Sequence, residues 1–159
     1  MDEIARKPTV LAVEAALRAA GVTPVVRVLP ETAPTAVAAA EQLGCPVAAI
    51  ANSLIFDTGG TPLLVLTSGA HRVDTGKVAA HLGVPELARA SAAFVREHTG
   101  QAIGGVAPVG HPAPIRTVID ETLAEQQQIW AAAGHPHTVF PTTFDELIAV
   151  TGAEVIAVD

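Results

Sequence analysis

The stretch from residue 104 to 111, Gly-Gly-Val-Ala-Pro-Val-Gly-His, combines residue types that suit a ligand-binding loop. Its three glycines and one proline exclude a helix or a regular central strand, because glycine loses backbone entropy on ordering and proline lacks an N–H group. Glycine also lets the backbone approach a ligand closely, so such a loop can direct N–H and C=O groups at a small polar target. A tight connection between two strands is the alternative interpretation.

Two polar residues stand inside an otherwise apolar run of strand length. Asn52 and Ser53 interrupt the sequence Ala-Ala-Ile-Ala-Asn-Ser-Leu-Ile-Phe over residues 48–56. A buried polar group requires a hydrogen-bonding partner or water. Asn52 therefore has two interpretations: a bulge at which its side chain bonds neighbouring backbone, or a position that faces a ligand.

The histidines and the cysteine form no recognisable metal or nucleophile motif. His135 and His137 are the closest pair of the six histidines, but Pro136 separates them and no carboxylate is near in sequence. Cys45 is the single cysteine, which excludes an internal disulfide, and we expect a small buried hydrophobe there rather than a nucleophile. The G-x-S-x-G, H-E-x-x-H, Walker and Rossmann patterns are missing. We therefore expect no metal and no cofactor.

Composition narrows the class of protein. The chain has 159 residues, of which 50% are apolar and 16% charged, so we expect one globular domain over residues 1–159. A net charge of −7 disfavours broad nucleic-acid binding, and any RNA contact should be local. No apolar run is long enough to cross a bilayer, and residues 1–7 mix acidic and basic side chains, so we expect a cytoplasmic protein without membrane contact. A monomer and a homodimer are both compatible with the sequence.

Apolar spacing, caps and glycine stops predict the elements that position these residues. Helices are predicted over residues 8–20, 35–43, 75–82, 92–98 and 144–151, with Thr32 or Thr35 as one of the caps. Strands are predicted over 25–29, 48–56, 62–67, 87–90, 115–119, 129–133, 138–140 and 154–158, and 121–127 is a short helix or a loop. Two adjacent strand pairs read as hairpins. We therefore predict an α+β fold with a mixed, mostly antiparallel sheet and outer helices, rather than a doubly wound parallel sheet.

The order of these segments resembles a known family. Ala51-Asn52-Ser53-Leu54-Ile55-Phe56, then segments 63–67, 73–83, 99–110 and 118–121, follow one another as in YbaK-like aminoacyl-tRNA deacylases. These are free-standing relatives of the editing domain inserted in bacterial prolyl-tRNA synthetases. The resemblance covers nearly the whole chain. Its most specific part is Gly105-x-x-Pro108-x-Gly110 together with the following strand that ends at Asp120.

The resemblance implies a domain built around a twisted, barrel-like mixed sheet. It also implies an activity, hydrolysis of the ester between an amino acid and the 3′ end of tRNA. A synthetase pocket discriminates one methylene group by only about 1 to 3 kcal/mol, so fidelity requires a second, hydrolytic site. Typical substrates of the family carry alanine or cysteine on tRNA(Pro), and a synthetase is a possible partner. The family is thought to use no metal and no protein nucleophile, with the terminal 2′-hydroxyl of the tRNA helping to position water.

The same resemblance suggests roles for the loop residues. Backbone groups of Gly104, Gly105 and Gly110 would hold the ester carbonyl and the amino group, and Pro108 would keep the loop rigid. His111 would orient water or contact the terminal adenosine, with a cap or turn role as the alternative.

Further candidates for substrate binding lie outside that loop. Asp120 would bind the substrate ammonium group or fix the loop. Ser68, His71 and Arg72, in the loop before the helix that begins after Asp74, complete the candidates for substrate binding.

One residue departs from the family pattern. The deacylases carry a lysine at the position of Asn52, where it is the usual candidate for anchoring the tRNA terminus, and asparagine keeps a hydrogen-bond donor but loses the charge. Two interpretations follow. Either another residue such as Arg72 or Arg116 anchors the tRNA and Asn52 still serves catalysis, or the chain is a binding module for an aminoacyl or nucleotide-like ligand without turnover.

Overall fold

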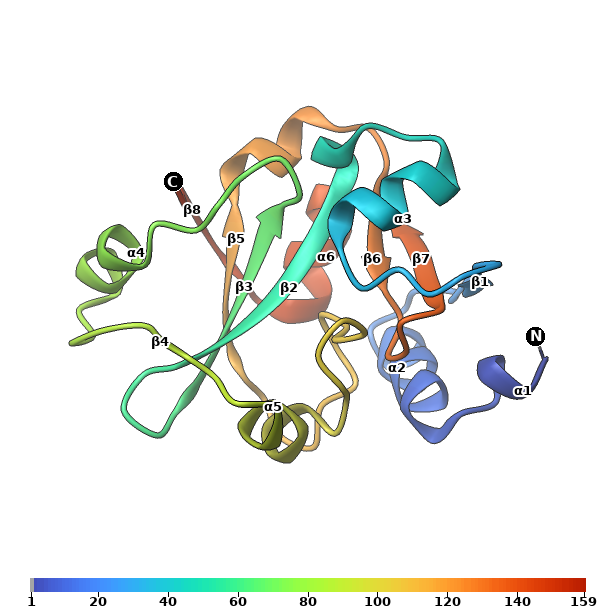
Figure 1. Cartoon of the computed structure of the whole chain (residues 1–159), viewed down its shortest axis with the longest axis horizontal. Helices are drawn as coiled ribbons and strands as arrows, with labels where there is room; N and C mark the ends of the chain where they lie inside the picture. The colour runs from blue at the N-terminus through green and yellow to red at the C-terminus, as the bar shows by residue number, and fades with distance from the viewer. Residues whose placement is uncertain (1) are drawn as a thin grey trace.

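The computed structural model describes residues 2–159 and shows a mixed eight-stranded sheet with helices packed around it (Figure 1). The strands are β1 (Arg27–Val28), β2 (Ile50–Asp57), β3 (Pro62–Ser68), β4 (Ala88–Arg89), β5 (Arg116–Asp120), β6 (Ile129–Ala132), β7 (Thr138–Thr142) and β8 (Glu154–Ile156). Their order is β1-β7-β6-β2-β3-β5-β8, and β4 also pairs with β2. Pairs β2·β3, β6·β7, β1·β7 and β2·β4 are antiparallel, whereas β2·β6, β3·β5 and β5·β8 are parallel. The predicted α+β class and both predicted hairpins are confirmed.

The helices begin and end where the caps and glycines predict. They are α1 (Asp2–Ala5), α2 (Pro8–Ala19), α3 (Ala36–Leu43), α4 (Thr75–Leu82), α5 (Ala92–Thr99) and α6 (Phe144–Thr151), with short 3-10 helices η1 (Val47–Ala49) and η2 (Glu121–Glu125). Side chains of Thr35, Asp74, Ser91 and Thr143 accept the backbone N–H three residues on, and a left-handed glycine follows each of these helices. Thr35, not Thr32, is the cap of α3, and α1 was not predicted.

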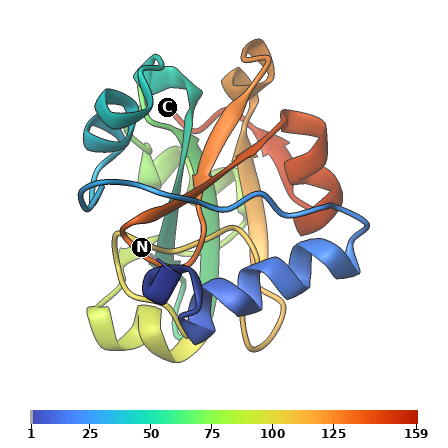
Figure 2. The same cartoon turned by 90° about the vertical axis from the view of Figure 1, so that its right-hand side faces the viewer.

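Alternating side chains of β2 pack on two faces of the sheet. Ala51 and Ile55 join Leu64 and Leu66 of β3 in the main core cluster, to which α2, α5 and α6 contribute Val13, Leu17, Val95 and Leu147. In Figure 2, α2 lies across the lower part of the sheet. On the other face, Phe56, Leu63 and Val65 pack with Val78 of α4, while Ile50 packs with Ala39 and Ala40 of α3. No helix within residues 2–159 is long and apolar enough to traverse a lipid bilayer.

Strand β2 has unequal neighbours along its two edges. Strand β3 pairs with it in one unbroken register from Ala51 to Asp57. The other edge is shared, because β6 pairs at Ile50 and Ala51, and β4 pairs at Phe56 and Asp57. Residues 52–55 therefore have no strand partner on this edge within the described sheet. The unbroken register with β3 also shows that Asn52 does not lie at a bulge, so that interpretation is wrong.

Close packing in the turn after β3 predicts that alanine substitutions at Gly69 and Gly76 have different effects on the stability of the protein. A Cβ at Gly69 would lie 2.6 Å from the carbonyl oxygen of Val47 and 2.7 Å from the Cβ of Ala36, so Gly69→Ala should lower the free energy of unfolding by about 1 to 3 kcal/mol. Gly76→Ala is the matched control. Its Cβ would meet only Asp74 Oδ1 at 3.6 Å, and alanine should be neutral or stabilising by up to about 1 kcal/mol in helix α4. Urea unfolding measures both, and equal effects of the two substitutions would contradict the predicted close packing.

Candidate functional site

A cavity of about 450 Å³ lies along the unpaired segment of β2. Residues 50–56 of β2 all contribute to its wall, from both faces of the strand. The rest of the wall comes from residues 33–36 and 39, Arg89 and Ala90, Val95, residues 103, 104 and 106, residues 130–132, and Thr138 and Val139. This volume falls in the range of sites for small molecules, and most of the wall is apolar. The cavity exists where the sheet lacks a strand between β6 and β4.

Polar groups converge on the wall from β2 itself. The N–H of Gly69 donates to the carbonyl of Ile50 at 2.8 Å, which makes these two residues a hydrogen-bonded pair in the β2·β3 register. Hydrogen-bonding direction alternates along an antiparallel pair, so the N–H and C=O groups of Ser53 and Ile55 point to the open edge. The Ser53 hydroxyl is buried without a partner in the described structure. Asn52 also lines the cavity and is partly exposed. The site thus offers several donors and acceptors to a ligand.

Two cationic side chains stand at opposite ends of the open segment. Arg89 of β4 is paired in register with Phe56, and it is the one charged residue of the cavity wall among the described residues. At the other end, Trp130 pairs with Ile50 and lines the cavity, and the guanidinium carbon of Arg27 lies 6.0 Å from its ring centroid. An otherwise uncharged cavity is therefore flanked by positive charge, although the whole chain is acidic.

The glycine-rich loop contributes to the cavity only through its first part. Gly104, with a φ of 93°, lines the wall. The Gly105 N–H donates to the carbonyl of Ala102 at 3.0 Å and is therefore occupied. A Cβ at Gly105 would lie 2.7 Å from the carbonyl carbon of His135 and 2.8 Å from the Pro136 nitrogen. Gly105 thus serves close packing between two loops.

A buried glutamine, which the sequence did not single out, braces the loop from inside. Gln101 is 1% exposed, accepts the Ala107 N–H at 2.7 Å and donates to the Val109 carbonyl at 3.3 Å. His111 Nε2 donates to the Ala107 carbonyl at 2.8 Å. Burial lowers the pKa of His111, and the bond to Ala107 offsets part of that effect. This geometry favours the turn role among the interpretations of His111.

The far end of the loop lies at a second, smaller hollow. Pro108, Gly110 and His111 line a depression of about 300 Å³ together with residues of α2 and α6. Gly110, with a φ of 86°, packs against α2, where a Cβ would lie 3.0 Å from backbone atoms of Val13. These three residues are not part of the wall of the larger cavity.

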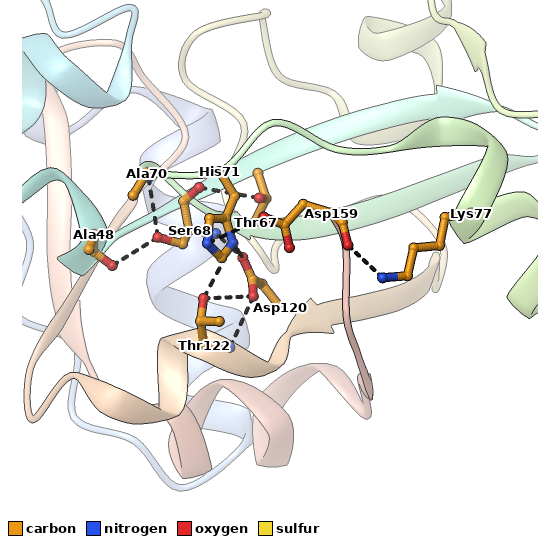
Figure 3. A network of polar contacts seen from close by, with 9 residues as sticks. All are labelled: Ala48, Thr67, Ser68, Ala70, His71, Lys77, Asp120, Thr122 and Asp159. Carbon is orange, nitrogen blue, oxygen red and sulfur yellow. Dashed lines mark hydrogen bonds and ion pairs between the residues drawn. The ribbon is translucent and has the colours of Figure 1, made fainter.

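Asp120 is the centre of a separate polar network, shown in Figure 3. Its carboxylate is 1% exposed and accepts four hydrogen bonds. The donors are the N–H of Ser68 at 2.9 Å, Nδ1 of His71 at 2.8 Å, and both the N–H (3.0 Å) and the hydroxyl (2.8 Å) of Thr122. The Ser68 hydroxyl donates to the Ala48 carbonyl and accepts from the N–H of Ala70. Of the two roles expected for Asp120, this geometry favours fixing the loops.

The protonation of Asp120 follows from these contacts. Burial by itself raises the pKa of a carboxyl group, but the hydrogen bonds from Ser68, Thr122 and His71 outweigh it and leave the pKa of Asp120 below its usual range. The carboxylate is therefore ionised at neutral pH and links the end of β3 to the end of β5.

The two closely spaced histidines support the loop beside Gly105. Their rings stack with centroids 5.6 Å apart, and His137 Nδ1 donates to the Leu29 carbonyl at 3.1 Å. Burial lowers the pKa of His135, and electrostatic interactions with His137 and Lys7 lower it further. Within residues 2–159, no three side chains of histidine, cysteine, aspartate or glutamate gather as metal ligands would. Cys45 is partly buried beside α3, and burial raises the pKa of its thiol.

The structure thus separates the predicted site residues into three places. Asn52 and Gly104 meet at the large cavity; Pro108, Gly110 and His111 lie at the small hollow; and Ser68, His71 and Asp120 form the buried network. Gly105 packs between loops, and Arg72 is exposed outside both hollows. Sequence reasoning noted Ser53 as a polar interruption of its strand but did not count it among the site residues. It missed Arg89, Trp130 and Thr138, because only strand pairing brings them to the cavity.

A mixed sheet beside a largely apolar cavity that also offers hydrogen-bonding groups, with a braced glycine loop at its rim, agrees with the fold expected for editing domains. The sequence profile of the aminoacyl-tRNA editing domain family matches residues 30–150. The chain belongs to this family, which confirms the resemblance to YbaK-like deacylases and to the editing domain of prolyl-tRNA synthetases.

Individual relatives support the assignment. A crystal structure of a candidate trans-editing enzyme for prolyl-tRNA synthetase superposes with a TM-score of 0.90 at 40% identity, covering 96% of this chain and 98% of that one. YwhH of Bacillus subtilis is 31% identical over 110 residues, 69% of each chain. A proline–tRNA ligase of Lysinibacillus sphaericus is 32% identical over 74 residues, which are 46% of this chain but only 13% of the ligase.

The buried network predicts a pH-dependent effect of Asp120→Asn. At neutral pH the substitution should lower the free energy of unfolding by about 1 to 3 kcal/mol, because buried donors lose a charged acceptor. A lowered carboxyl pKa gives stability that is present above the unfolded pKa and lost as pH falls through the folded one. The difference between wild type and variant should therefore shrink on acidification below about pH 4. Urea unfolding across pH measures it.

Glu97→Gln, at an exposed position of α5, is the control and should change stability by less than about 0.5 kcal/mol. A pH-independent difference between Asp120→Asn and wild type would show that the Asp120 carboxylate does not carry this stabilisation.

Proposed function

We propose that this protein is a trans-editing hydrolase that removes a small amino acid, alanine or cysteine, from mischarged tRNA(Pro). Membership of the aminoacyl-tRNA editing domain family and the likeness to a candidate trans-editing enzyme for prolyl-tRNA synthetase support an editing role. The observation that carries the proposal is the cavity at the open edge of β2, where Asn52, the orphaned Ser53 hydroxyl and free backbone groups meet an apolar wall.

The site chemistry follows from these groups. The ester carbonyl accepts hydrogen bonds from donors at the open edge of β2 and from the Asn52 amide, which stabilise the negative charge that develops on its oxygen. Water attacks the carbonyl carbon, the bond to the ribose oxygen breaks, and the proton lost by water passes to that oxygen, releasing the amino acid and a free tRNA terminus. The terminal 2′-hydroxyl positions the water. Gly104 shapes the rim of the cavity.

The apolar wall supports a preference for a small uncharged acyl side chain. Ala51, Ala90 and Ala131 line the cavity with Val95 and Val106 on the core side of β2. A buried cationic side chain would have no acidic partner among the described residues of the wall, and its desolvation would cost several kcal/mol. The side chains of alanine and cysteine are compatible with this apolar part of the wall, whereas those of lysine and arginine are not.

A non-catalytic binding module is the second candidate, and Asn52 is the observation that favours it. The resemblance to YbaK-like deacylases implies a lysine at this position, whereas this chain has Asn52, and an amide has no charge with which to anchor a phosphate. Such a module would bind the aminoacyl terminus saturably without accelerating hydrolysis.

Release of amino acid from purified Ala-tRNA(Pro), Cys-tRNA(Pro) and correctly charged Pro-tRNA(Pro) distinguishes the two candidates. We expect the protein to accelerate loss of one mischarged species and to spare Pro-tRNA(Pro). Binding of a mischarged species with no acceleration would establish the module instead. Equal acceleration of all three would contradict the proposed selectivity.

The role of Asn52 has its own test. Asn52→Ala should lower kcat/KM for the hydrolysed species by about 100-fold, the effect of removing one donor to a developing oxyanion, without changing the unfolding transition. Asn52→Lys restores the family residue and should remain active. Gln127→Ala, at an exposed position outside the cavity, is the control. Wild-type turnover in Asn52→Ala would remove Asn52 from the mechanism.

A further inference from the structure

The charge distribution around the cavity is uneven. The chain carries a net charge of −7, yet the one charged residue that lines the cavity within the described structure is Arg89. Its side chain is exposed, and the described residues provide it with no ion pair. A guanidinium at the edge of a largely apolar cavity offers paired N–H donors in the geometry that suits a phosphate.

The other arginines are placed differently. Arg72 is exposed in the turn after β3, and Arg116 is exposed at the first position of β5, and neither lines the cavity. Arg27 lies over the ring of Trp130 at the opposite end of the open segment, and it is also outside the cavity wall. Arg72 and Arg116, the two anchors suggested by the sequence, thus lie outside the cavity wall.

Strand pairing sets the position of Arg89 relative to the reactive groups. Arg89 of β4 pairs with Phe56 of β2. Phe56 is three residues beyond Ser53 along β2, so the two positions are about 10 Å apart. The flexible arginine side chain covers part of this span. In an aminoacyl-adenosine 5′-phosphate, the ribose separates the ester from the phosphate. One aminoacyl nucleotide can therefore place its ester beside Ser53 and its phosphate beside Arg89.

We propose that Arg89 binds the phosphate on the 5′ side of the terminal adenosine of the tRNA, and so supplies the anchoring charge that Asn52 lacks. This inference rests on the proposed function for the identity of the ligand. Arg89 is a binding residue in this role: it holds the nucleotide so that the ester reaches the open edge of β2, and it takes no part in bond breaking.

Equilibrium binding tests the assignment without requiring turnover. The probes are a CCA trinucleotide that carries alanine through a stable 3′-amide, and 3′-alanylamino-3′-deoxyadenosine, which lacks any phosphate. Arg89→Gln should weaken trinucleotide binding by about 10- to 100-fold and leave binding of the nucleoside within about 2-fold. It should also reduce the slope of log affinity against log salt by about 0.7, the value for one contact to a single strand.

Matched variants control for general charge effects. Arg116→Gln removes the same charge outside the cavity and should leave affinity and salt slope near wild type. Arg89→Lys keeps the charge but not the paired donors and should lie between wild type and Arg89→Gln. In the deacylation assay, Arg89→Gln should raise KM and change kcat by less than about 2-fold.

Three results would overturn the assignment. The first is that Arg89→Gln weakens binding of the trinucleotide and of the nucleoside equally. The second is that Arg27→Gln, and not Arg89→Gln, reduces the slope of log affinity against log salt. The third is that the wild-type protein binds neither probe. The proposed function fails separately: a protein that binds the trinucleotide through Arg89 but accelerates no deacylation retains the phosphate contact and loses the hydrolytic role.

Discussion

The requirement that backbone N–H and C=O groups be paired or hydrated governs this structure. Strand β2 satisfies it fully along β3, but on its other edge only at the two ends, through β6 and β4. The middle of this edge stays unpaired, because β6 pairs with β2 only at Ile50 and Ala51, and β4 pairs only at Phe56 and Asp57. A cavity lined by main-chain polar groups results, and the remaining elements are arranged around it.

Two buried polar side chains keep the surroundings of that cavity in place. Asp120 ties the turn after β3 to the start of η2, and Gln101 closes the glycine loop upon itself. Each side chain satisfies several backbone groups that would otherwise be orphaned, and removing a buried acceptor leaves a desolvation cost of about 1 to 3 kcal/mol per group. Neither residue lines the cavity, so their contribution is to the position of the loops rather than to the chemistry.

Local signals allowed much of the fold to be predicted. Thr35, Asp74, Ser91 and Thr143 cap helices by contacts over three residues, and such contacts are visible in a sequence. The candidate site was harder to predict, because its contacts are distant in sequence. The Asp120 carboxylate reaches Ser68, which is 52 residues away, and Arg89 meets Phe56 only through pairing of short strands. The Gly105 N–H illustrates the same problem, since nothing in the sequence shows that the Ala102 carbonyl already occupies it.

The packing of the glycine loop has a consequence for how the cavity receives a ligand. Gly105 is pressed against the His135–Pro136 peptide and Gly110 against the backbone of α2, so the loop is held on two sides. A segment fixed in this way does not act as a flap that closes on its ligand. The part of the cavity rim that Gly104 contributes is instead held in place by packing within the protein itself. Binding of a ligand in this cavity therefore requires little further ordering of the loop, which removes one of the entropic costs of association.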